Sequence, residues 1–390
     1  MNKIKYIFKI TKNIVFYIIS FFILISIINM FVPIAADSIN YSTKIYKKIF
    51  RTISGIKNNP YHKPNFKNLN WAKEHFQEFL KLKVEYHDYL IWRRVAFDGK
   101  TIKIDKNGFR LNNYDEEMVS FKNSDAWFFG GSTMWGSGSR NEDTIPSKFE
   151  RISNIKSINF GETGYTSTQE LNLLIKYISF SNPKIVVFYD GVNDIYHKCR
   201  KENNFYSSSI EKKIKPIVEE KVYTDWYNFE TKNVLKNNLT IIKNLKKSLI
   251  QTFGKKNTSR LFDCDLNEKK SQLIVQNLIN NWKLAKYLTE NQTNPGIFIP
   301  ILQPVSFLSK SKTEHLDNYT DEVKNQFIYM YKLIKAELKK NNFNYLDFTS
   351  TLDDHEYFFW DHAHVTPNGN IKIAEAIFKE TLKQNLLYDK

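Results

Sequence analysis

The sequence predicts an α/β fold from residue 124 onward, a doubly wound, flavodoxin-like three-layer sandwich with a five-stranded parallel sheet. In this part of the chain, short apolar runs alternate with longer stretches of helical periodicity. Such alternation is typical of buried parallel strands joined by helical crossovers. In this architecture ligands bind beyond the carboxyl ends of the strands, so the residues that follow each run are the first candidates for function.

The five strand candidates are apolar runs bounded by polar or glycine residues. In chain order they are DAWFFGG, KSINFG, KIVVFYDG, GIFIPIL and NYLDF. Long helical candidates lie between them and after the last, at residues 167–181, 267–291, 318–341 and 367–386. Parallel strands need crossovers of this length, so the elements agree with one another.

One stretch interrupts the rhythm, at residues 200–265. It is rich in Lys and Asn, has only weak helical runs and is too long for an ordinary loop. We interpret it as an inserted subdomain or lid within the α/β domain at 124–390. The only two cysteines, Cys199 and Cys264, lie at its ends. They exclude a cysteine-rich zinc site, and either a disulfide or two buried free thiols is compatible with the sequence.

The N-terminal part contains a candidate membrane span. Residues 13–36 carry no charge and are long enough to cross a hydrocarbon layer of ~30 Å as one helix. A cleaved signal peptide is the alternative, but this run exceeds the usual apolar region of such peptides. Lys12 directly precedes the run, whereas Asp37 follows it, so residues 1–12 are expected in the cytosol and the bulk of the chain outside the cytoplasm.

Between the span and the α/β domain, two segments are expected. Residues 37–70 are polar and basic and suit a stalk. Residues 71–123 form a leader that packs on the domain, with an amphipathic helix over 71–95 and a hairpin around Asn107-Gly108. An Asn-Gly pair between alternating runs is a strong hairpin signal.

The charge balance limits the partners. The chain has 57 Lys and Arg against 41 Asp and Glu, a formal charge of +16. The lysines are scattered along the chain among Asn, Ile, Phe and Tyr, so no concentrated basic face is expected and we predict no nucleic-acid partner. An acidic glycan or an anionic lipid surface would use the same charge.

A nucleophile candidate follows the first strand. In Gly130-Gly131-Ser132-Thr133, Ser132 stands at the carboxyl edge of the sheet on a turn into a helix. The helix N-terminus favours the negative charge that develops in acyl transfer. The alternative is an ordinary strand-to-helix turn with Ser as N-cap. The second flanking glycine of G-x-S-x-G is missing, so an ordinary α/β-hydrolase elbow is not supported.

An acid-base pair follows the last strand. Asp361 and His364 lie three residues apart in WDHAHVTPNGN, where the carboxylate can hold Nδ1 of the imidazole while Nε2 faces outward. His362 is the rival base, but its position next to Asp361 makes the same hydrogen bond awkward. A metal site that uses these residues with His355 is a further alternative, although the spacing is a weak zinc signal.

Two more strand ends carry polar or glycine residues. Asn193, in Gly191-Val192-Asn193-Asp194, can donate its side-chain amide to an oxyanion or can form an Asx turn that caps the next helix. After the second strand, residues 159–166 contain glycines whose backbone N–H groups are near the same edge. Nucleophile, oxyanion donors and an Asp-His pair therefore come from four separate strand ends.

This order of motifs resembles the SGNH (GDSL-like) hydrolase superfamily. Its four blocks are matched by GGST at 130–133, N-x-G-x-x-G-x-T at 159–166, G-x-N-D at 191–194 and D-x-x-H at 361–364. The resemblance covers residues 124–390, and the stretch around WRR and GKTIKIDKNGFR resembles the leader that precedes this domain in exported bacterial relatives.

The resemblance implies a role for each matching residue. Ser132 would be the nucleophile, His364 the general base and Asp361 the carboxylate that orients it. The oxyanion hole would consist of the Ser132 and Gly164 backbone N–H groups and the Asn193 side chain.

Two positions depart from the simplest match. Gly161 is an alternative to Gly164, which we choose because it lies five residues after Asn159 and directly before the Tyr-Thr-Ser turn, as in the family's pattern. The Asp that often precedes the nucleophile is Gly131 here, which bears on the subgroup only.

The resemblance implies a membrane-anchored serine esterase, with an acylated envelope glycan as substrate and no cofactor or metal. Within the superfamily the alternatives are an O-acyltransferase on an envelope polysaccharide and a lipid esterase or thioesterase. A non-catalytic, membrane-tethered binding protein is the alternative from another class.

Overall fold

The computed structural model describes residues 60–113, 123–204, 260–316 and 319–388, with the single residues 20 and 211. The expected membrane span at 13–36 lies outside these ranges, apart from residue 20, and so does most of the insertion at 200–265. No helix within the described ranges combines the length and the apolar character that membrane crossing requires. Two compact units divide the chain, and the unit described below comprises residues 60–218 and 260–390.

The centre of this unit is a parallel sheet of five strands, in the order β6-β5-β7-β8-β9. Counted along the chain this is the 2-1-3-4-5 order of flavodoxin-like folds, which confirms the predicted α/β architecture. The strands are β5 (Ala126–Gly130), β6 (Ser157–Asn159), β7 (Ile185–Asp190), β8 (Ile297–Leu302) and β9 (Leu346–Asp347), and each falls within a run predicted from the sequence.

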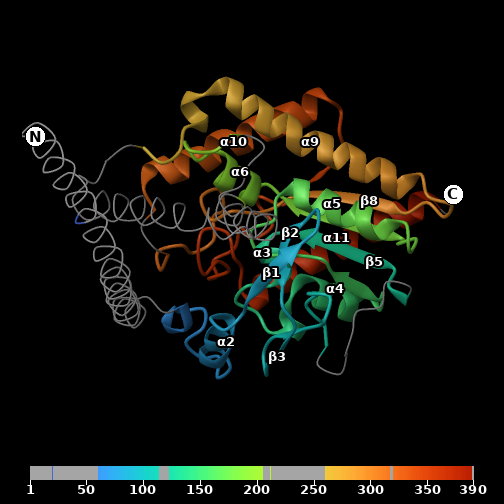
Figure 1. The fold of residues 1–390 in the computed structure, drawn as a ribbon, viewed down its shortest axis with the longest axis horizontal. Coiled ribbons are helices and arrows are strands. Elements are labelled where there is room, and N and C mark those ends of the chain that lie inside the picture. The colour runs from blue at the N-terminus through green and yellow to red at the C-terminus, as the bar shows by residue number, and fades with distance from the viewer. Residues whose placement is uncertain are drawn as a thin grey trace, which may run out of the picture. The chain divides into compact units, whose positions relative to one another are not determined.

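Helices cover both faces of the sheet (Figure 1). One face packs against four helices and the other against two. The first set is α5 (Ser167–Ile178), α6 (Val192–Lys198), α9 (Glu268–Glu290) and α10 (Asp321–Lys340), and the second is α4 (Ile145–Ser153) and α11 (Pro367–Tyr388).

The central strands β5, β7 and β8 are almost entirely apolar because both of their faces are buried. In β5, Trp127 and Phe129 face the core under α5 and α9, while Ala126 and Phe128 face the core under α4 and α11. All four side chains are fully buried. A strand covered on both sides has no solvent face for polar residues, which explains why the runs do not alternate.

The leader differs from its predicted form between residues 71 and 95. The helix is short, α2 (Ala72–Phe79), and an antiparallel pair follows it, β1 (Val84–His87) with β2 (Ile91–Arg94). The prediction of one helix to residue 95 is wrong because Val84-Glu85-Tyr86-His87 alternates with period two, which a strand satisfies and a helix does not.

The predicted hairpin around Asn107-Gly108 is confirmed. Strand β4 (Lys103–Ile104), which pairs with the short β3 (Phe97–Asp98), turns back so that Ile104 bridges Arg110. Gly108 has φ +80°, a conformation that favours glycine. Arg110 also bridges Asn159 of β6, so the hairpin joins the edge of the main sheet.

The described end of the expected stalk packs against the domain. After a 3₁₀ turn at Pro60–His62, Phe66 is only 1% exposed and makes edge-to-face contacts with Phe76 and Trp360. Residues 60–70 are therefore not a stalk. An aromatic residue that can pack against two others gains more from burial than from exposure in a tether.

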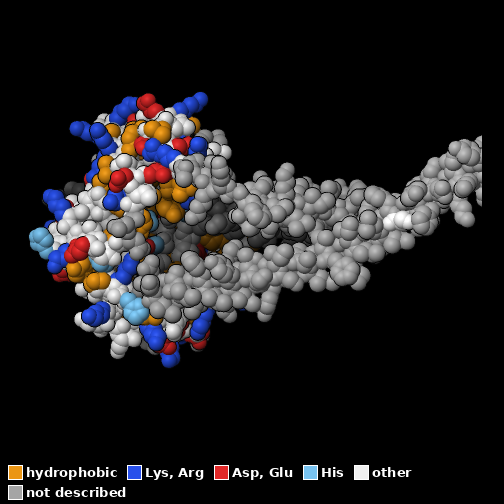
Figure 2. All heavy atoms as spheres, turned by 90° about the vertical axis from the view of Figure 1, so that its left-hand side faces the viewer, with side chains coloured by type: hydrophobic (Ala, Val, Ile, Leu, Met, Phe, Trp, Pro, Cys, Tyr) orange, Lys and Arg blue, Asp and Glu red, His pale blue; other side chains and the backbone are white. Residues whose placement is uncertain are grey.

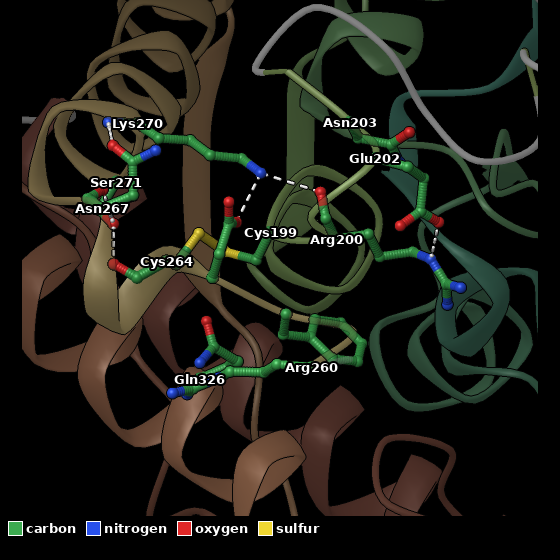
Figure 3. Close-up of polar contacts among 12 residues, drawn as sticks. Cys199, Arg200, Glu202, Asn203, Arg260, Cys264, Asn267, Lys270, Ser271 and Gln326 are labelled. Atoms are coloured by element: carbon green, nitrogen blue, oxygen red, sulfur yellow. Dashed lines mark hydrogen bonds and ion pairs between the residues drawn. A yellow bond between two sulfur atoms is a disulfide. The ribbon is translucent and has the colours of Figure 1, made fainter. Parts of the chain in front are cut away.

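Cys199 and Cys264 form a disulfide across 65 residues, which resolves the two readings left open by the sequence. Cys199 ends α6, and Cys264 begins the 3₁₀ turn that precedes α9. In Figure 3, Lys270 of α9 reaches over the disulfide to the carbonyl of Arg200 at 2.8 Å and the carboxylate of Asp263 at 2.7 Å. The disulfide and this lysine hold together the two ends of the insertion.

The basic residues are dispersed on the face shown in Figure 2. Lys and Arg side chains lie there among Asp, Glu and apolar side chains, without gathering into one patch. The basic side chains drawn on that face are thus dispersed, as the scattered lysines of the sequence suggest.

Candidate active site

The predicted nucleophile stands where it was expected, at the carboxyl end of β5. Ser132 is the first residue of the short helix α3 (Ser132–Trp135), and Gly131 precedes it in an extended conformation. A Cβ on Gly131 would lie 2.1 Å from the side-chain nitrogen of Asn193. The glycine is therefore required by a close approach between the nucleophile turn and α6.

The predicted acid-base pair lies on the turn Phe358–Thr366, which leads into α11. The base of this turn is closed by a bridge between Phe359 and Val365 and by the bond from Thr366 N–H to Phe358 carbonyl at 2.8 Å. At its tip, Oδ1 of Asp361 accepts backbone hydrogen bonds from Ala363 and His364 at 2.8 and 2.7 Å. The carboxylate thus organises the turn that carries it.

The turn brings three predicted residues together. Nδ1 of His364 lies 2.6 Å from Oδ2 of Asp361, and Nε2 lies 2.6 Å from Oγ of Ser132. Hydroxyl, imidazole and carboxylate form one hydrogen-bonded chain across 232 residues of sequence. In this arrangement the imidazole can accept the serine proton as the oxygen attacks an electrophile.

The Asp361 carboxylate stays ionised although it is largely buried. Burial would raise the pKa of Asp361, but the attraction and the hydrogen bond of His364 outweigh it, and the pKa lies below the usual range of Asp. An ionised Asp361 holds Nδ1 as the protonated nitrogen, which leaves Nε2 as the acceptor for Ser132.

The candidate oxyanion donors border the same turn. The Asn193 amide nitrogen donates to the Tyr165 carbonyl at 2.7 Å, and because an amide has two N–H groups a second remains for a ligand. Gly164, with φ +81°, occupies the turn closed by the bond from Tyr165 N–H to Glu162 carbonyl. As the first residue of α3, Ser132 has a backbone N–H without an acceptor inside the helix.

The alternative glycine has a different environment. A Cβ on Gly161 would lie 2.4 Å from the backbone nitrogen of Trp135, so Gly161 lets β6 pack closely against α3. Its neighbour Asn159 donates to the carbonyl of Met134 at 3.1 Å. Gly161 and Asn159 thus support the nucleophile helix. Gly164 instead lies next to Tyr165, whose carbonyl accepts the hydrogen bond from Asn193.

The rival histidine is engaged elsewhere. His362 hydrogen-bonds the Tyr319 hydroxyl at 3.2 Å and stacks on Phe307 and Tyr196. Burial lowers the pKa of His362. The charge of Asp361 raises it by a smaller amount, and His364 lowers it further. Within the described residues no group of three or more His, Cys, Asp or Glu side chains is placed to hold a metal ion.

Trp360 is a site residue that the sequence analysis missed. Its indole stacks on the His364 ring, with centroids 5.0 Å apart and planes 18° apart, and its Nε1 donates to the Ser137 carbonyl at 3.3 Å. From the segment at 60–79, Lys63 donates to the Trp360 carbonyl at 2.7 Å, and Phe66 packs on the indole. The only sequence signal was its place directly before Asp361.

Two buried arginines before the hydrolase domain also reach the site. Arg110 donates to the carbonyls of Trp135 and Gly136 at 3.1 and 2.7 Å, at the end of α3. Arg94 donates to the Thr163 hydroxyl at 2.8 Å, next to Gly164. Both the nucleophile helix and the Gly164 turn are therefore fixed by residues of the leader.

A cluster of buried acids lies behind Asn193. Asp194 pairs with Lys198 at 2.7 Å and accepts hydrogen bonds from the backbone and side chain of Ser167, so it fastens α6 to the start of α5. Burial, and then the Asp194 charge, raises the pKa of Asp190 to about 7. Burial and the Asp190 charge likewise raise the pKa of Glu170 well above its ordinary value.

The raised pKa of Asp190 predicts a pH-dependent stability. Between its ordinary pKa of about 3.9 and about 7, the folded state holds a proton that the unfolded state has released. Protonated Asp190 therefore stabilises the folded state. This contribution to the free energy of unfolding is complete below about pH 4 and is lost as pH rises through about 7. Replacing Asp190 by Asn, which keeps an acceptor for Trp282, should flatten this decline.

Urea unfolding at several pH values between 4 and 8 measures the effect. Asp98→Asn, at an exposed carboxylate, is the matched control and should follow the unchanged protein. Parallel curves for Asp190→Asn and the unchanged protein would show that this group does not control the decline.

A comparison with known protein families identifies one for this chain. The sequence profile of the family "GDSL-like Lipase/Acylhydrolase" matches residues 127–377, which is more than half of the chain. A search of curated proteins finds no match.

Solved structures that match this chain include a member of the lipolytic G-D-S-L family from Veillonella parvula, at 13% identity and a TM-score of 0.37, over 65% of this chain and 96% of that chain. A putative acylhydrolase from Bacteroides fragilis has 13% identity and a TM-score of 0.35, over 81% and 97%. A carbohydrate acetylesterase family member from Sinorhizobium meliloti has 12% identity and a TM-score of 0.34, over 66% and 98%. The profile match decides the assignment: the chain belongs to the GDSL-like lipase/acylhydrolase family and is a hydrolase of that family.

Proposed function

We propose that this protein is a membrane-anchored serine esterase that removes acyl groups, acetyl in the simplest case, from a glycan of the cell envelope. Ser132 is the nucleophile, His364 the general base and Asp361 the group that orients it. The observation that carries the proposal is the continuous chain of 2.6 Å hydrogen bonds from Ser132 through His364 to Asp361.

In the first step, Nε2 of His364 takes the hydroxyl proton of Ser132 while Oγ attacks the ester carbonyl carbon. The carbonyl oxygen becomes an oxyanion, which the N–H groups of Ser132, Gly164 and Asn193 stabilise, each by about 3 kcal/mol in the transition state. Collapse breaks the bond to the sugar oxygen, which leaves with the proton held by His364. The acyl group stays on Ser132.

In the second step, water gives a proton to His364 and its oxygen attacks the acyl-enzyme carbonyl. The same three donors hold the second oxyanion. Collapse breaks the bond to Oγ of Ser132, which recovers the proton from His364, and the carboxylic acid departs. Asp361 stays ionised throughout and stabilises the imidazolium of each step.

Trp360 should affect turnover through the stack on His364. Trp360→Leu removes the ring that restrains the imidazole and should lower kcat about tenfold with little change in KM, because a misplaced base weakens the transition state and not substrate binding. Trp360→Phe keeps an aromatic face and should retain most of the activity.

Steady-state kinetics on p-nitrophenyl acetate, with thermal unfolding of both variants beside it, tests this role. A rise in KM at unchanged kcat would make Trp360 a substrate contact instead. Equal losses in the Leu and Phe variants would remove stacking as the cause.

The substrate class is inferred from location and charge. The uncharged run at 13–36 and the disulfide between Cys199 and Cys264 support a catalytic domain outside the cytoplasm, where disulfides persist. Envelope polysaccharides that carry esters are within reach of a protein anchored there. The formal charge of +16 favours an acidic polymer over a neutral one.

Rates of hydrolysis of p-nitrophenyl esters with short and long acyl chains show which acyl group the protein prefers. The purified full chain in detergent should prefer acetyl esters. A preference for long acyl chains would favour a lipid esterase or thioesterase, and no turnover of any ester would favour a non-catalytic binding protein.

The acyl acceptor needs a separate experiment, because an O-acyltransferase would share the first step. Acetylated oligosaccharides should release acetate in the presence of the protein. Unacetylated sugars that gain about 42 Da, one acetyl group, from a donor ester would show transfer to a sugar hydroxyl in place of hydrolysis.

The proposed compartment has its own measurement. Protein from its native location should contain the Cys199–Cys264 disulfide, which in the chain-entropy description stabilises the fold by roughly 4 kcal/mol for a loop of this length. Intact mass after alkylation with and without reductant detects it. Two alkylated thiols without reductant would contradict an oxidising location.

A further inference from the structure

The structure contains a cavity that none of the proposed catalytic residues lines. Its volume is about 590 Å³, within the range of about 300–1,000 Å³ that small-molecule sites occupy. Its walls come from the segment around Asn65–Trp71, the loop around Arg140, the residues near Lys312 and Tyr357, and the start of α11 at Pro367.

This cavity shares a wall with the turn that carries Asp361 and His364. Tyr357 and Thr366, which line the cavity, stand at the two ends of that turn. Asn65, also in the lining, donates to the carbonyls of Phe359 and Tyr357 at 2.7 and 3.2 Å. A molecule in the cavity would therefore contact the base of the turn whose tip carries the acid-base pair.

The lining combines aromatic rings with amides. Trp71 and Tyr357 supply ring surface, and Asn68 and Asn368 are exposed and supply amide donors and acceptors. Sugars have C–H faces that pack on aromatic rings and hydroxyls that pair with amides, so this combination suits a saccharide better than a purely apolar ligand.

One cation in the lining, Lys312, favours an acidic saccharide. Its one buried acid, Asp143, is neutralised by Arg140 at 2.8 Å and Lys148 at 2.6 Å. Lys312 is exposed, lies over the Tyr357 ring at 5.4 Å from its centroid and makes no ion pair within the described part of the chain. Arg140 also pairs with Glu142 at 2.9 Å, so Lys312 is the cation of the lining that these ion pairs leave for a ligand carboxylate, with the exposed acids Glu356 and Glu314 nearby.

We propose that this cavity is an accessory binding site for acidic sugar residues of the substrate, with Lys312 pairing with a sugar carboxylate and Tyr357 packing on a sugar ring. The proposal rests on the proposed function for the view that the substrate is a glycan. Binding in the cavity, however, requires no catalytic step, so the two can be tested separately.

The experiment measures binding to the full chain in detergent with Ser132→Ala, which removes turnover from the measurement. Isothermal titration calorimetry measures the affinity for tetragalacturonate, an acidic oligosaccharide, and for xylotetraose, a neutral one. We expect binding of the acidic probe, weak or no binding of the neutral one, and a loss of affinity for the acidic probe as salt rises.

Two variants locate the site. In the Ser132→Ala background, Lys312→Gln and Tyr357→Leu should each weaken tetragalacturonate binding by about tenfold, which corresponds to about 1.4 kcal/mol. Lys269→Gln, at an exposed lysine of α9, loses the same charge and should bind like its parent. Thermal unfolding of each variant shows whether the fold is retained.

The outcomes separate the two proposals. Equal binding of both probes, no binding of either, or the same loss in Lys269→Gln and Lys312→Gln would overturn the accessory site. Hydrolysis of p-nitrophenyl acetate by the protein with Ser132 intact tests the esterase proposal independently. An active esterase that does not bind tetragalacturonate would therefore refute only the cavity's role.

Discussion

Ser132→Ala and His364→Ala should each lower kcat for ester hydrolysis by about 10⁴- to 10⁶-fold. The two side chains are 2.6 Å apart and perform one proton transfer, so neither can act without the other. The double variant should consequently be scarcely worse than either single variant. The residual activity of these variants would come from the backbone oxyanion donors and from substrate binding alone.

Steady-state and single-turnover kinetics on an acetyl ester measure these losses, and circular dichroism confirms that the fold is kept. Ser153→Ala is a matched serine control, because this hydroxyl donates to the Phe149 carbonyl on α4 and has no part in the site. Losses that multiply in the double variant would mean that Ser132 and His364 act independently, which is incompatible with the proposed mechanism.

The elements that could be predicted are those whose signals are local. Each sheet strand is a short apolar run, and its burial on both faces follows from its own composition. Asp361 and His364 are three residues apart, so their pairing depends on one turn. Ser132 could be placed beside them only because parallel strands end at the same edge of the sheet.

The features that could not be predicted depend on contacts between distant segments. The bond from Lys63 to the Trp360 carbonyl joins residues 297 positions apart. Arg110 looked like a hairpin residue, yet its guanidinium holds the end of α3 through carbonyls 25 and 26 residues away. Backbone carbonyls have no sequence signature, so an arginine that binds them cannot be recognised from spacing.

The leader was mispredicted for a related reason. Within residues 71–95 the helix ends at Phe79, and residues 84–87, which alternate with period two, pair with residues 91–94 further along the chain. The sequence places Phe66 in a polar stalk, because its partners Phe76 and Trp360 lie in other segments. Local periodicity is a weak guide wherever the partner is far along the chain.

The second large effect is expected at Asn193. Asn193→Ala should lower kcat by about 10²- to 10³-fold with little change in KM, because a donor aimed at the developing oxyanion acts in the transition state and not in the ground state. The amide lies against Gly131, directly before Ser132, and one of its N–H groups already binds the Tyr165 carbonyl at 2.7 Å.

The change also removes the bond to Tyr165, so stability must be measured beside activity. Asn172→Ala, on the exposed side of α5, removes a comparable bond from an asparagine to a carbonyl, that of Tyr89 at 3.2 Å, and should leave kcat unchanged. Asn193→Asp keeps the shape but replaces the donor by a negative charge, and should be at least as damaging as Ala because it repels the oxyanion. A rise in KM alone for Asn193→Ala would instead make Asn193 a contact to the bound ester, and the oxyanion would then depend on the backbone N–H groups of Ser132 and Gly164.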